Sequence, residues 1–507
     1  MQLLQRSFNW LIKQRLSHLE RCIKCPLETQ EALLQQLIGK SQKTVFGIQF
    51  EFSSIERVTD FKTRVPTHTY EQLYPYLECV LRGEQNILWP TPIKWFAKSS
   101  GTTNASSKFI PVSPEALQEG HYRAGKDMLA VYVNNYPYNQ IANGKNVGLG
   151  GSLFPNAWHP RSATQYGDVS AVLIKNLPFW AQWSRTPDLA VALMDQWEEK
   201  VEALARIIAK ENVTSIAGVP TWVLLLLQKV LALQNRYCIH DVWPMLELFI
   251  HGGMAFEPYK ALFQAMSSKD LHYLSVYNAS EGFFAVQDQV DAKDMLLLLD
   301  HGVFYEFVSL DEVEKEYPQT VGLGEVVLGK IYALIISTNA GLWRYQIGDT
   351  IKFTSLAPFR IKIAGRTKHF INAFGEEVVV DNAEEAIEKA CQFTDATLRD
   401  YTAGPRYLEA DKSGSHEWVI EFADPPSNLE YFIDILDATL QSINTDYEAK
   451  RHKNLVLTRP MVHCAPHGFF YQWLKKQGKL GEQQKVPRLA NNRKYLDDIL
   501  AILASKN

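Results

Sequence analysis

Apolar residues recur at intervals of three and four over the first 45 residues of the chain. This spacing puts them on one face of a helix, and we therefore predict helices that pack against a core. The same stretch contains the basic residues Lys13, Arg15 and Arg21, so a helix that lies on a membrane surface is an alternative. The apolar positions that carry the repeat are Phe8, Leu11, Ile12, Leu16, Leu19, Leu33, Leu34 and Leu37.

Helix and strand patterns alternate in the middle of the chain. A charged amphipathic helix is predicted over residues 194–210, a strand over 213–219, and a strongly apolar, buried helix over 222–233. Another strand follows at 246–251 and runs into a pair of glycines. This order of elements predicts an α/β fold in which helices flank β-sheets.

The composition is that of a folded protein, with 46% hydrophobic and 21% charged residues. A net charge of −4 gives no electrostatic case for binding nucleic acid. The most apolar runs, residues 223–227 and 295–299, are far shorter than the ~20 residues that cross a bilayer. The N-terminus also lacks the apolar region of a signal peptide. We therefore predict a cytoplasmic protein without a transmembrane segment.

Cysteines are few and mostly isolated. Cys22 and Cys25 form a single CxxC, whereas a zinc or redox site of that type usually has a second pair or a strand-to-helix setting. His463, Cys464 and His467 lie close together but beside turn-forming residues. The pattern favours reduced thiols over a metal site at either place.

Hydroxyl residues and a glycine are concentrated at residues 99–107, between the apolar runs 93–97 and 109–112. The runs predict two strands, and the small residues predict a loop that joins them. Backbone N–H groups and hydroxyls of such a loop can bind phosphate oxygens, and a lysine adds positive charge. An ordinary polar hairpin loop is the alternative. The candidate phosphate-binding residues are Ser99, Ser100, Gly101, Thr102, Thr103 and Lys108.

The sequence SSGTT, followed by Lys108 and Pro111, resembles the phosphate-binding loop of the GH3 family of acyl acid amido synthetases, which are acyl-adenylate-forming enzymes. We identify the chain as a bacterial-type member. The loop has Asn104 and Ala105 near a position where plant-type loops usually have glycine, so plant hormone specificity is not carried over. The family implies a large N-terminal adenylate-forming domain, with β-sheets flanked by helices, and a small mobile α/β C-terminal domain.

Two further segments resemble GH3 motifs, in the order that the family has them. In VYNASEGFF, the resemblance implies that the Tyr277 ring contacts adenine, the Ser280 hydroxyl reaches the α-phosphate and the Glu281 carboxylate holds Mg²⁺. In WRYQIGD, it implies that Asp349 accepts hydrogen bonds from both ribose hydroxyls. Either segment alone is weak evidence, because a Gly-Asp pair is often a plain turn.

The strand LELFIHGGM ends in glycines that let a ligand approach the backbone closely. A similar strand and glycine turn lie beside the acyl-substrate pocket in the GH3 family. The resemblance therefore makes His251, Gly252, Gly253 and Met254 candidate substrate-binding residues. A tight strand-to-helix turn with no contact to substrate is the alternative.

The segment around Gly365 resembles the hinge of adenylating enzymes, where glycine absorbs the dihedral change of a domain rotation. We predict a large ATP- and acyl-substrate domain over residues 1–365 and a small domain over 366–507. Arg366 would bond the ribose or the phosphates.

QKVPRL near the C-terminus resembles the GH3 tail motif, which implies that Lys485 stabilises the charge on the pentavalent α-phosphorus after domain closure. A solvated basic tail is the alternative.

Together these resemblances imply a ligase that uses ATP and Mg²⁺, with Lys485 and Glu281 as catalytic residues. A carboxylic acid is expected to form an acyl-adenylate with release of pyrophosphate, and an amine, an amino acid in the family, then takes the acyl group. One alternative has a thiol acceptor such as coenzyme A. Another is a non-catalytic homologue that binds a nucleotide or acyl ligand. Neither nucleic acid nor an obligatory protein partner is indicated.

Overall fold

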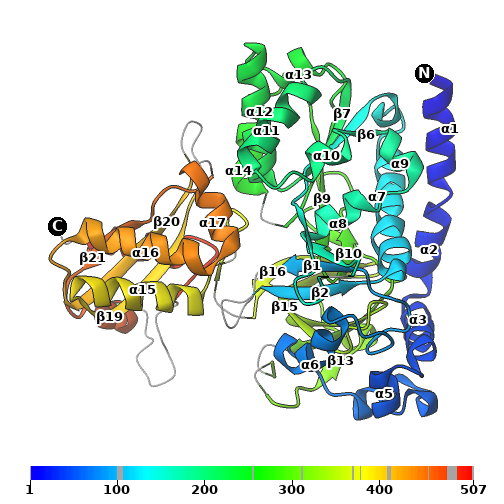
Figure 1. The fold of residues 1–507 in the computed structure, drawn as a ribbon, viewed down its shortest axis with the longest axis horizontal. Coiled ribbons are helices and arrows are strands. Elements are labelled where there is room, and N and C mark those ends of the chain that lie inside the picture. Colours follow the sequence, from blue (N-terminus) through cyan, green and yellow to red (C-terminus); the bar gives the residue numbers. More distant parts are fainter. Residues whose placement is uncertain are drawn as a thin grey trace. The chain divides into compact units, whose positions relative to one another are not determined.

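The computed structural model describes residues 2–99, 107–160, 162–253, 256–309, 312–313, 315–367, 370–376, 378–407, 413–454, 456–476 and 488–504. The chain divides into two compact units, which Figure 1 shows as a ribbon. Each unit has its own sheets and its own buried apolar residues. Unit 1 consists of Met1–Ser99, Lys108–Gly253 and Phe263–Thr367, and unit 2 of Ser100–Ser107, Met254–Leu262 and Lys368–Asn507.

Helices follow one another at the start of the chain, as the apolar repeat predicts. Leu34 and Leu37 are fully buried, and Ile12 and Leu19 nearly so, which confirms that these helices pack on a core. Leu11 is instead exposed, because consecutive helical residues lie about 100° apart and its neighbour Ile12 faces inward. The helices are α1 (Gln2–Lys13), α2 (Leu16–Lys24), α3 (Pro26–Ser41), α4 (Val45–Gln49), α5 (Val58–Arg64) and α6 (Tyr70–Leu81).

A sheet of twelve strands runs through the described part of unit 1. Neighbouring strands are antiparallel from β13 to β9 and parallel from β9 to β6. The α/β pattern is confirmed for the parallel part, where helices connect the strands. In spatial order the strands are β13 (Thr320–Val321), β12 (Val303–Ser309), β14 (Ile331–Thr338), β15 (Tyr345–Leu356), β16 (Phe359–Arg366), β11 (Met295–Leu297), β10 (Gly282–Val286), β9 (His272–Ala279), β8 (Leu248–His251), β7 (Val213–Gly218), β3 (Lys145–Gly148) and β6 (Arg185–Thr186).

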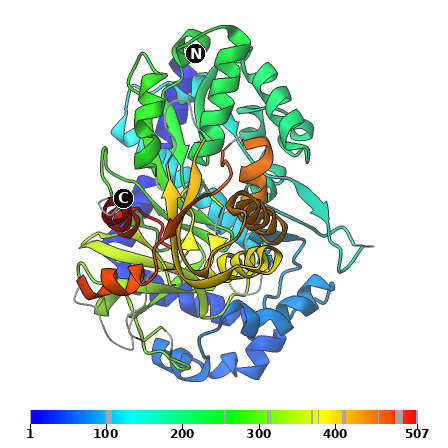
Figure 2. The same ribbon diagram turned by 90° about the vertical axis from the view of Figure 1, so that its left-hand side faces the viewer.

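Helices α11 (Trp197–Ile208) and α12 (Pro220–Gln234) lie side by side in both Figure 1 and Figure 2. Pro220 occupies the first turn of α12, and Asn235 ends it with φ 51°, a left-handed residue typical of a helix C-terminus. Most of its apolar residues are buried, as predicted. The other helices before β9 are α7 (Tyr122–Asn135), α8 (Val169–Lys175), α9 (Phe179–Trp183), α10 (Leu189–Ala192), α13 (Ile239–Val242) and α14 (Glu257–Ala265).

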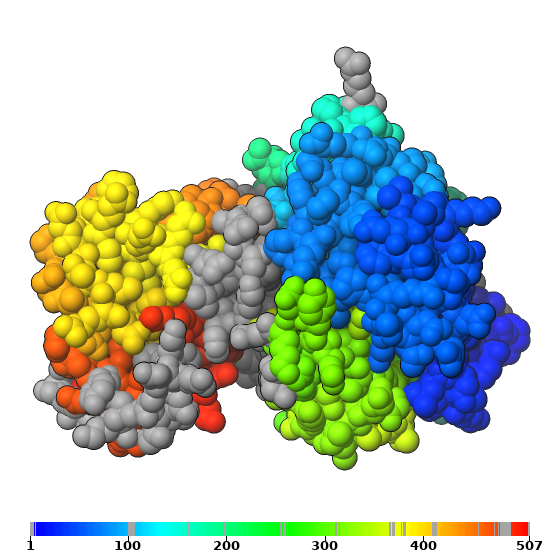
Figure 3. Space-filling view, turned by 90° about the horizontal axis from the view of Figure 1, so that it is seen from below, coloured from blue at the N-terminus to red at the C-terminus, as the bar shows by residue number. Residues whose placement is uncertain are grey.

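Helices α3 and α5 contact the antiparallel part of the sheet, whereas α1 and α2 pack against α7. The fully buried ring of Trp343 lies 4.8 Å from that of Phe52, and α5 contributes Lys62, whose Nζ donates to the Thr320 carbonyl at 3.2 Å. In Figure 3 the first hundred residues, in blue, accordingly lie against the yellow-green segment near residue 320. A second sheet, of four described strands, has the order β2 (Lys108–Val112), β1 (Trp95–Ser99), β5 (Gln165–Gly167) and β4 (Leu153–Pro155).

Unit 2 combines a three-stranded sheet, a two-stranded sheet and helices. β19 pairs antiparallel with β20, and β20 pairs parallel with β21. Phe469, Trp473 and Ile499 form part of its buried apolar cluster. The described elements are β17 (Phe370–Ile371), β18 (Val378–Val379), α15 (Val380–Thr394), β19 (Thr397–Arg406), β20 (Ser415–Asp424), α16 (Leu429–Ile443), α17 (Thr445–Arg451), β21 (Met461–Ala465), α18 (Phe469–Lys476) and α19 (Lys494–Ala504).

No helix among the described residues has the length and apolarity that crossing a bilayer requires.

Candidate functional site

The serine- and threonine-rich loop joins two antiparallel strands, as the flanking apolar runs predict. Ser99 at the end of β1 pairs with Lys108 at the start of β2, so the chain leaves and returns at adjacent positions. The Phe109 N–H donates to Tyr70 Oη at 2.9 Å, and the Phe109 ring packs 4.5 Å from that of Trp158. These contacts fix the base of the loop. The predicted Ser100, Gly101, Thr102 and Thr103 lie outside the described residues.

Lys108 is a buried cation between two aromatic rings. Its Nζ donates to Tyr345 Oη at 3.1 Å and lies 5.6 Å from the centroids of both the Tyr70 and Tyr345 rings. A charged ammonium at such distances is stabilised by the ring quadrupoles. Since Tyr345 begins β15, this contact links the base of the loop to the strand that carries Asp349.

Tyr277 and Asp349 meet in the interior of unit 1. Tyr277 Oη donates to Asp349 Oδ2 at 2.5 Å, and both side chains are buried. The two residues lie on β9 and β15, which stand four places apart in the sheet. A hydrogen bond across that separation requires the sheet to curl. The structure therefore brings together the second and third predicted motifs, and the tyrosine hydroxyl orients the carboxylate.

The backbone before Asp349 has a conformation that favours glycine. Gly348 has φ +91°, and its carbonyl accepts a hydrogen bond from the Thr367 N–H at 2.8 Å. Asp349 pairs with Arg366 on the neighbouring β16. The predicted hinge segment thus lies next to the predicted ribose ligand in backbone register. The Arg366 side chain lies outside the described part of the chain.

Ser280 and Glu281 form the two-residue turn of the β9–β10 hairpin, because Ala279 pairs with Gly282. Both turn residues are half-buried. In nucleotide sites Mg²⁺ is held by one or two carboxylates together with substrate phosphates. One carboxylate at this turn, Glu281, therefore fits the predicted Mg²⁺-binding role.

His251, Gly252 and Gly253 occupy the carboxyl end of β8. A Cβ on Gly252 would lie 2.5 Å from the Val276 carbonyl oxygen, and Gly253 has φ +79°. The backbone therefore favours glycine at both positions. Met254, the fourth predicted residue, lies outside the described residues. Binding of an acyl substrate here stays a prediction.

The carboxyl ends of the parallel strands gather at one edge of the sheet. Gly148 on β3 pairs with Ala217 on β7, Gly218 pairs with His251, and His251 pairs with Ser275 on β9. Ligands of α/β proteins bind outside this edge. Ser280 and Glu281 follow β9 immediately, so the predicted acyl and metal residues lie at the same edge.

Two residues near this edge were missed by reasoning from the sequence. His121 Nδ1 donates to Asn278 Oδ1 at 3.0 Å, beside Tyr277 on β9. Lys200 is buried, and its Nζ donates to the carbonyls of Gly150 and Gly151, at 2.5 and 3.0 Å, in the segment after β3. Lys200 falls in the helix predicted over 194–210, and nothing in the local pattern around either residue sets it apart from its neighbours.

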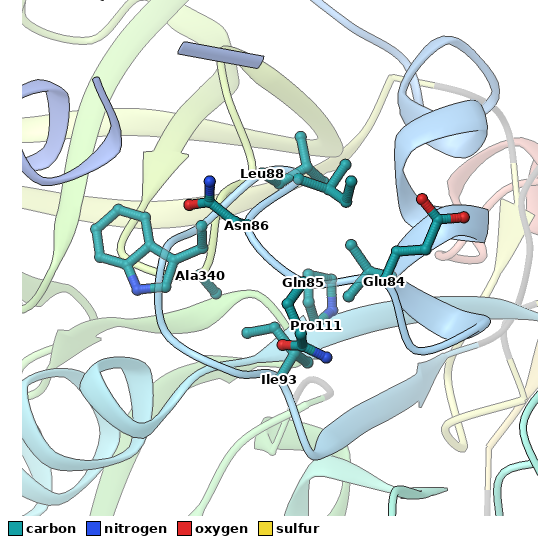
Figure 4. A pocket seen from close by; sticks show the side chains of 10 residues that line it. Glu84, Gln85, Asn86, Leu88, Ile93, Pro111 and Ala340 are labelled. Atoms are coloured by element: carbon teal, nitrogen blue, oxygen red, sulfur yellow. The ribbon is translucent and has the colours of Figure 1, made fainter. Parts of the chain in front are cut away.

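A small cavity elsewhere in unit 1 contains none of the predicted site residues. Figure 4 shows Glu84, Gln85 and Asn86 around it, with Leu88, Ile93, Pro111 and Ala340. Its lining is largely apolar and brings no cluster of titratable groups together, so it is not the candidate site.

The lowered pKa values of three buried histidines predict how the stability of unit 1 depends on pH. Burial lowers the pKa of His68 and His121 to about 4 and that of His251 to about 3, from 6.5 in the unfolded chain. Below pH 6.5 the unfolded chain therefore binds protons that the folded chain does not. Stability is full above that pH and falls as the pH decreases, by about 1.4 kcal/mol per pH unit for each histidine.

The measurement is urea unfolding between pH 7.5 and 5. His121→Gln is expected to reduce the pH dependence of the unfolding free energy by about 2 kcal/mol between pH 6.5 and 5. The matched control is His467→Gln, because His467 is exposed on unit 2. An unchanged pH dependence in His121→Gln would contradict the assignment.

A large unit with a twelve-stranded sheet and a separate small α/β unit make up a fold that this chain shares with solved structures of acyl-adenylating proteins. The structure of a 2-hydroxyisobutyryl-CoA ligase in complex with 2-HIB-AMP and CoA shares it, with a TM-score of 0.56 and 12% identity over 94% of this chain and 91% of that chain.

Within this class the chain belongs to the GH3 family. Residues 15–271 match the GH3 family N-terminal domain, 296–366 the central domain and 381–494 the C-terminal domain. Indole-3-acetic acid-amido synthetase GH3.3 of Arabidopsis thaliana is 21% identical, over 90% of this chain and 88% of that protein. The structure of the AtGH3.15 acyl acid amido synthetase in complex with 2,4-DB superimposes with a TM-score of 0.62 and 18% identity, over 97% and 96% of the two chains.

Proposed function

We propose that this protein is an ATP-dependent acyl acid amido synthetase. A carboxylate oxygen of the acid attacks the α-phosphorus of ATP, and pyrophosphate leaves. The nitrogen of an amine then attacks the acyl carbon, AMP leaves with the bonding pair, and the amine loses a proton to solvent. Membership of the GH3 family supports the reaction class. The observation that carries the proposal is the bond between Tyr277 and Asp349, because it unites two separate motifs at one place.

Each predicted residue has a place in this reaction. Asp349 is the acceptor for the ribose hydroxyls. The loop that begins at Ser99 and ends at Lys108 binds phosphates, and Lys108 contributes a charge at its base. Glu281 would hold Mg²⁺, which would supply positive charge to the substrate phosphates when bound. Arg366 is adjacent to Asp349 in register and is assigned to the ribose or phosphates. The remaining assignments are His251, Gly252, Gly253 and Met254 to the acyl acid, Tyr277 and Ser280 to the nucleotide, and Lys485 to the transition state.

The acceptor is proposed to be an amine, as the words amido synthetase in both names indicate for those proteins, and in particular an amino acid, as the resemblance to the GH3 family implies. The two relatives differ in the acid that their names contain, so no particular acid is assigned to this chain. A coenzyme A acceptor is the alternative, because the ligase that shares the fold uses one. A cytoplasmic location and a bacterial-type origin remain predictions.

Carboxylate-dependent exchange of labelled pyrophosphate into ATP tests the first half-reaction. A panel of aryl and alkyl acids is expected to contain at least one that supports exchange, because exchange requires only adenylation and its reversal. Product analysis with amino acids or coenzyme A then identifies the acceptor. ATP binding without exchange for any acid would instead support the non-catalytic homologue.

Lys485→Ala is expected to lower the adenylation rate about 100- to 1,000-fold with ATP affinity nearly unchanged. The reason is that a lysine which arrives on closure stabilises charge in the transition state only. Pre-steady-state formation of acyl-AMP and equilibrium ATP binding separate the two effects. Lys476→Ala is the control, because Lys476 is an exposed lysine at the end of α18. An unchanged rate would remove Lys485 from the mechanism.

A further inference from the structure

Three side chains of types that can bind a metal ion converge in unit 1, and none of them belongs to the proposed nucleotide site. His18 and Cys22 are four residues apart on α2 and therefore share one helix face. Asp300 lies in the turn between β11 and β12. One ligand atom of each residue lies within 4.8 Å of the other two. His18 Nε2 is 3.0 Å from Asp300 Oδ2 and 3.9 Å from Cys22 Sγ.

Two of the three separations lie near the edges of a tetrahedral zinc site, and the third, between Cys22 Sγ and the carboxylate, is at most 4.8 Å. Zinc bonds of ~2.0–2.2 Å to nitrogen and oxygen and ~2.3 Å to sulfur imply an N···O edge of about 3.3 Å and an N···S edge of about 3.6 Å. The distances from His18 Nε2 differ from these by about 0.3 Å each. Three protein ligands leave a fourth position for water.

The contacts do not suit a proton relay. In a Cys-His-Asp relay, the thiol and the carboxylate contact opposite nitrogens of the imidazole ring, so that the ring can pass a proton between them. In this cluster the sulfur of Cys22 and the carboxylate of Asp300 both approach Nε2 of His18. Convergence of three electron-pair donors on one point is instead the arrangement that a cation requires.

The surroundings balance the charge of the cluster. Arg15 Nε donates to Asp127 Oδ1 at 2.6 Å, and His301 Nε2 lies 2.9 Å from Asp127 Oδ2. Arg123 Nη1 lies 3.4 Å from Asp300 Oδ2. Each arginine is thus paired with a carboxylate, and α7, which lies beside α2 in Figure 1, supplies Arg123 and Asp127. These paired charges leave no excess positive charge to repel a divalent cation.

The cluster combines access from solvent with a desolvated sulfur. The side chains of His18 and Asp300 are 25% and 27% exposed, which gives an ion a route to them. Cys22 is buried, and burial raises the pKa of its thiol to about 11. It also borders an apolar cavity lined by Leu19, Ile23 and Leu298, among others. A metal that binds there must displace the thiol proton, and an apolar surrounding strengthens the bond that replaces it.

We propose that His18, Cys22 and Asp300 bind one Zn²⁺ ion, which fastens α2 to the turn before β12. The S–H bond of Cys22 breaks, a sulfur–zinc bond forms and the proton passes to solvent. Zinc suits a nitrogen, sulfur and oxygen set, whereas Mg²⁺ and Ca²⁺ take oxygen ligands. Of the two cysteines in the CxxC motif, only Cys22 is therefore a ligand of the proposed zinc site. Cys25 is exposed and outside the cluster.

Titration of the chelator-treated full chain with Co²⁺ and Zn²⁺ tests the site. Co²⁺ is expected to give the thiolate-to-cobalt charge-transfer absorption of a cysteine-ligated tetrahedral site at one equivalent, and Zn²⁺ to remove it by displacement. Cys22→Ala is expected to lose this absorption and to weaken Zn²⁺ binding at least about 100-fold, since loss of even a second-shell partner costs 10- to 100-fold. Cys25→Ser is the matched control and is expected to behave like the unchanged protein.

Thermal unfolding with and without Zn²⁺ adds a readout that does not depend on the proposed ligase activity. Zn²⁺ is expected to raise the melting temperature of the unchanged protein and of Cys25→Ser, but not of Cys22→Ala or His18→Gln, because an ion that binds only the folded chain stabilises it. Circular dichroism of the metal-free variants verifies that they fold. The proposal is overturned if Co²⁺ gives no thiolate band with the unchanged protein, or if Cys22→Ala retains it. In either case His18 and Asp300 form a hydrogen bond only.

Discussion

Replacement of Asp349 by alanine is expected to abolish acid-dependent pyrophosphate exchange. The carboxylate is buried, held by the Tyr277 hydroxyl, and assigned to both ribose hydroxyls of ATP. Hydrogen bonds to a charged acceptor contribute about 1.5–3 kcal/mol each, so loss of two lowers the rate about 100- to 10,000-fold. The measurement is the exchange rate at saturating acid, together with the equilibrium dissociation constant of ATP.

Removal of Asp349 also takes away the acceptor of a buried tyrosine hydroxyl, and a control must separate this structural effect. The double variant Tyr277→Phe with Asp349→Ala leaves no such hydroxyl and is expected to regain stability but no exchange. Tyr277→Phe alone keeps the carboxylate and loses only its orientation, so exchange is expected to fall by about 10- to 100-fold, the effect of one hydrogen bond to a charged acceptor. Substantial exchange by Asp349→Ala would show that the carboxylate has a structural role only.

Local structure could be predicted where one short stretch determines it. The strands on both sides of the serine-rich loop follow from the apolar runs around Ser99 and Lys108. These features depend on neighbouring residues and on backbone sterics. The helices at the start of the chain were predictable for the same reason.

Contacts between distant segments could not be predicted in this way. The bond from Tyr277 to Asp349 depends on how the antiparallel part of the sheet curls, and no periodicity in either segment contains that information. The same is true of the cluster of His18, Cys22 and Asp300, where one ligand is separated from the others by most of unit 1. Order along the chain suggested that the motifs belong together, whereas the contact itself needed the fold.

The arginine of the third motif, WRYQIGD, shows that the role of a residue within a motif also could not be predicted from the sequence. Arg344 precedes Asp349 in the sequence, and an arginine at this place could be taken for a phosphate ligand. In the structure it is instead buried, and its Nε and Nη2 donate to the Glu306 carboxylate at 2.9 and 2.8 Å. Its Nη1 donates to the carbonyls of Lys62 and Val65. Arg344 therefore holds the start of β15 to the N-terminal helices. Its role is to position the strand that carries Asp349.

Arg344→Met is accordingly expected to destabilise unit 1 by about 3–5 kcal/mol, because it leaves the carboxylate of Glu306 buried without a cationic partner, with the Thr320 hydroxyl as a remaining donor. The measurement is the free energy of urea unfolding, followed by the fluorescence change of the buried tryptophans. Arg206→Met is the matched control. Arg206 pairs with Glu202 one helical turn away on an exposed face, and such pairs contribute less than about 1 kcal/mol.

The double variant Arg344→Met with Glu306→Leu tests the cause of that loss. Replacement of both charges removes the unpaired carboxylate, so it is expected to recover part of the lost stability. Recovery should stay incomplete, because the carbonyls of Lys62 and Val65 still lack the donors that Arg344 supplied, and each buried acceptor left unpaired costs about 1–3 kcal/mol. If the double variant were no more stable than Arg344→Met, the ion pair would not be the source of the effect, and the bonds to the two carbonyls would account for the attachment of β15.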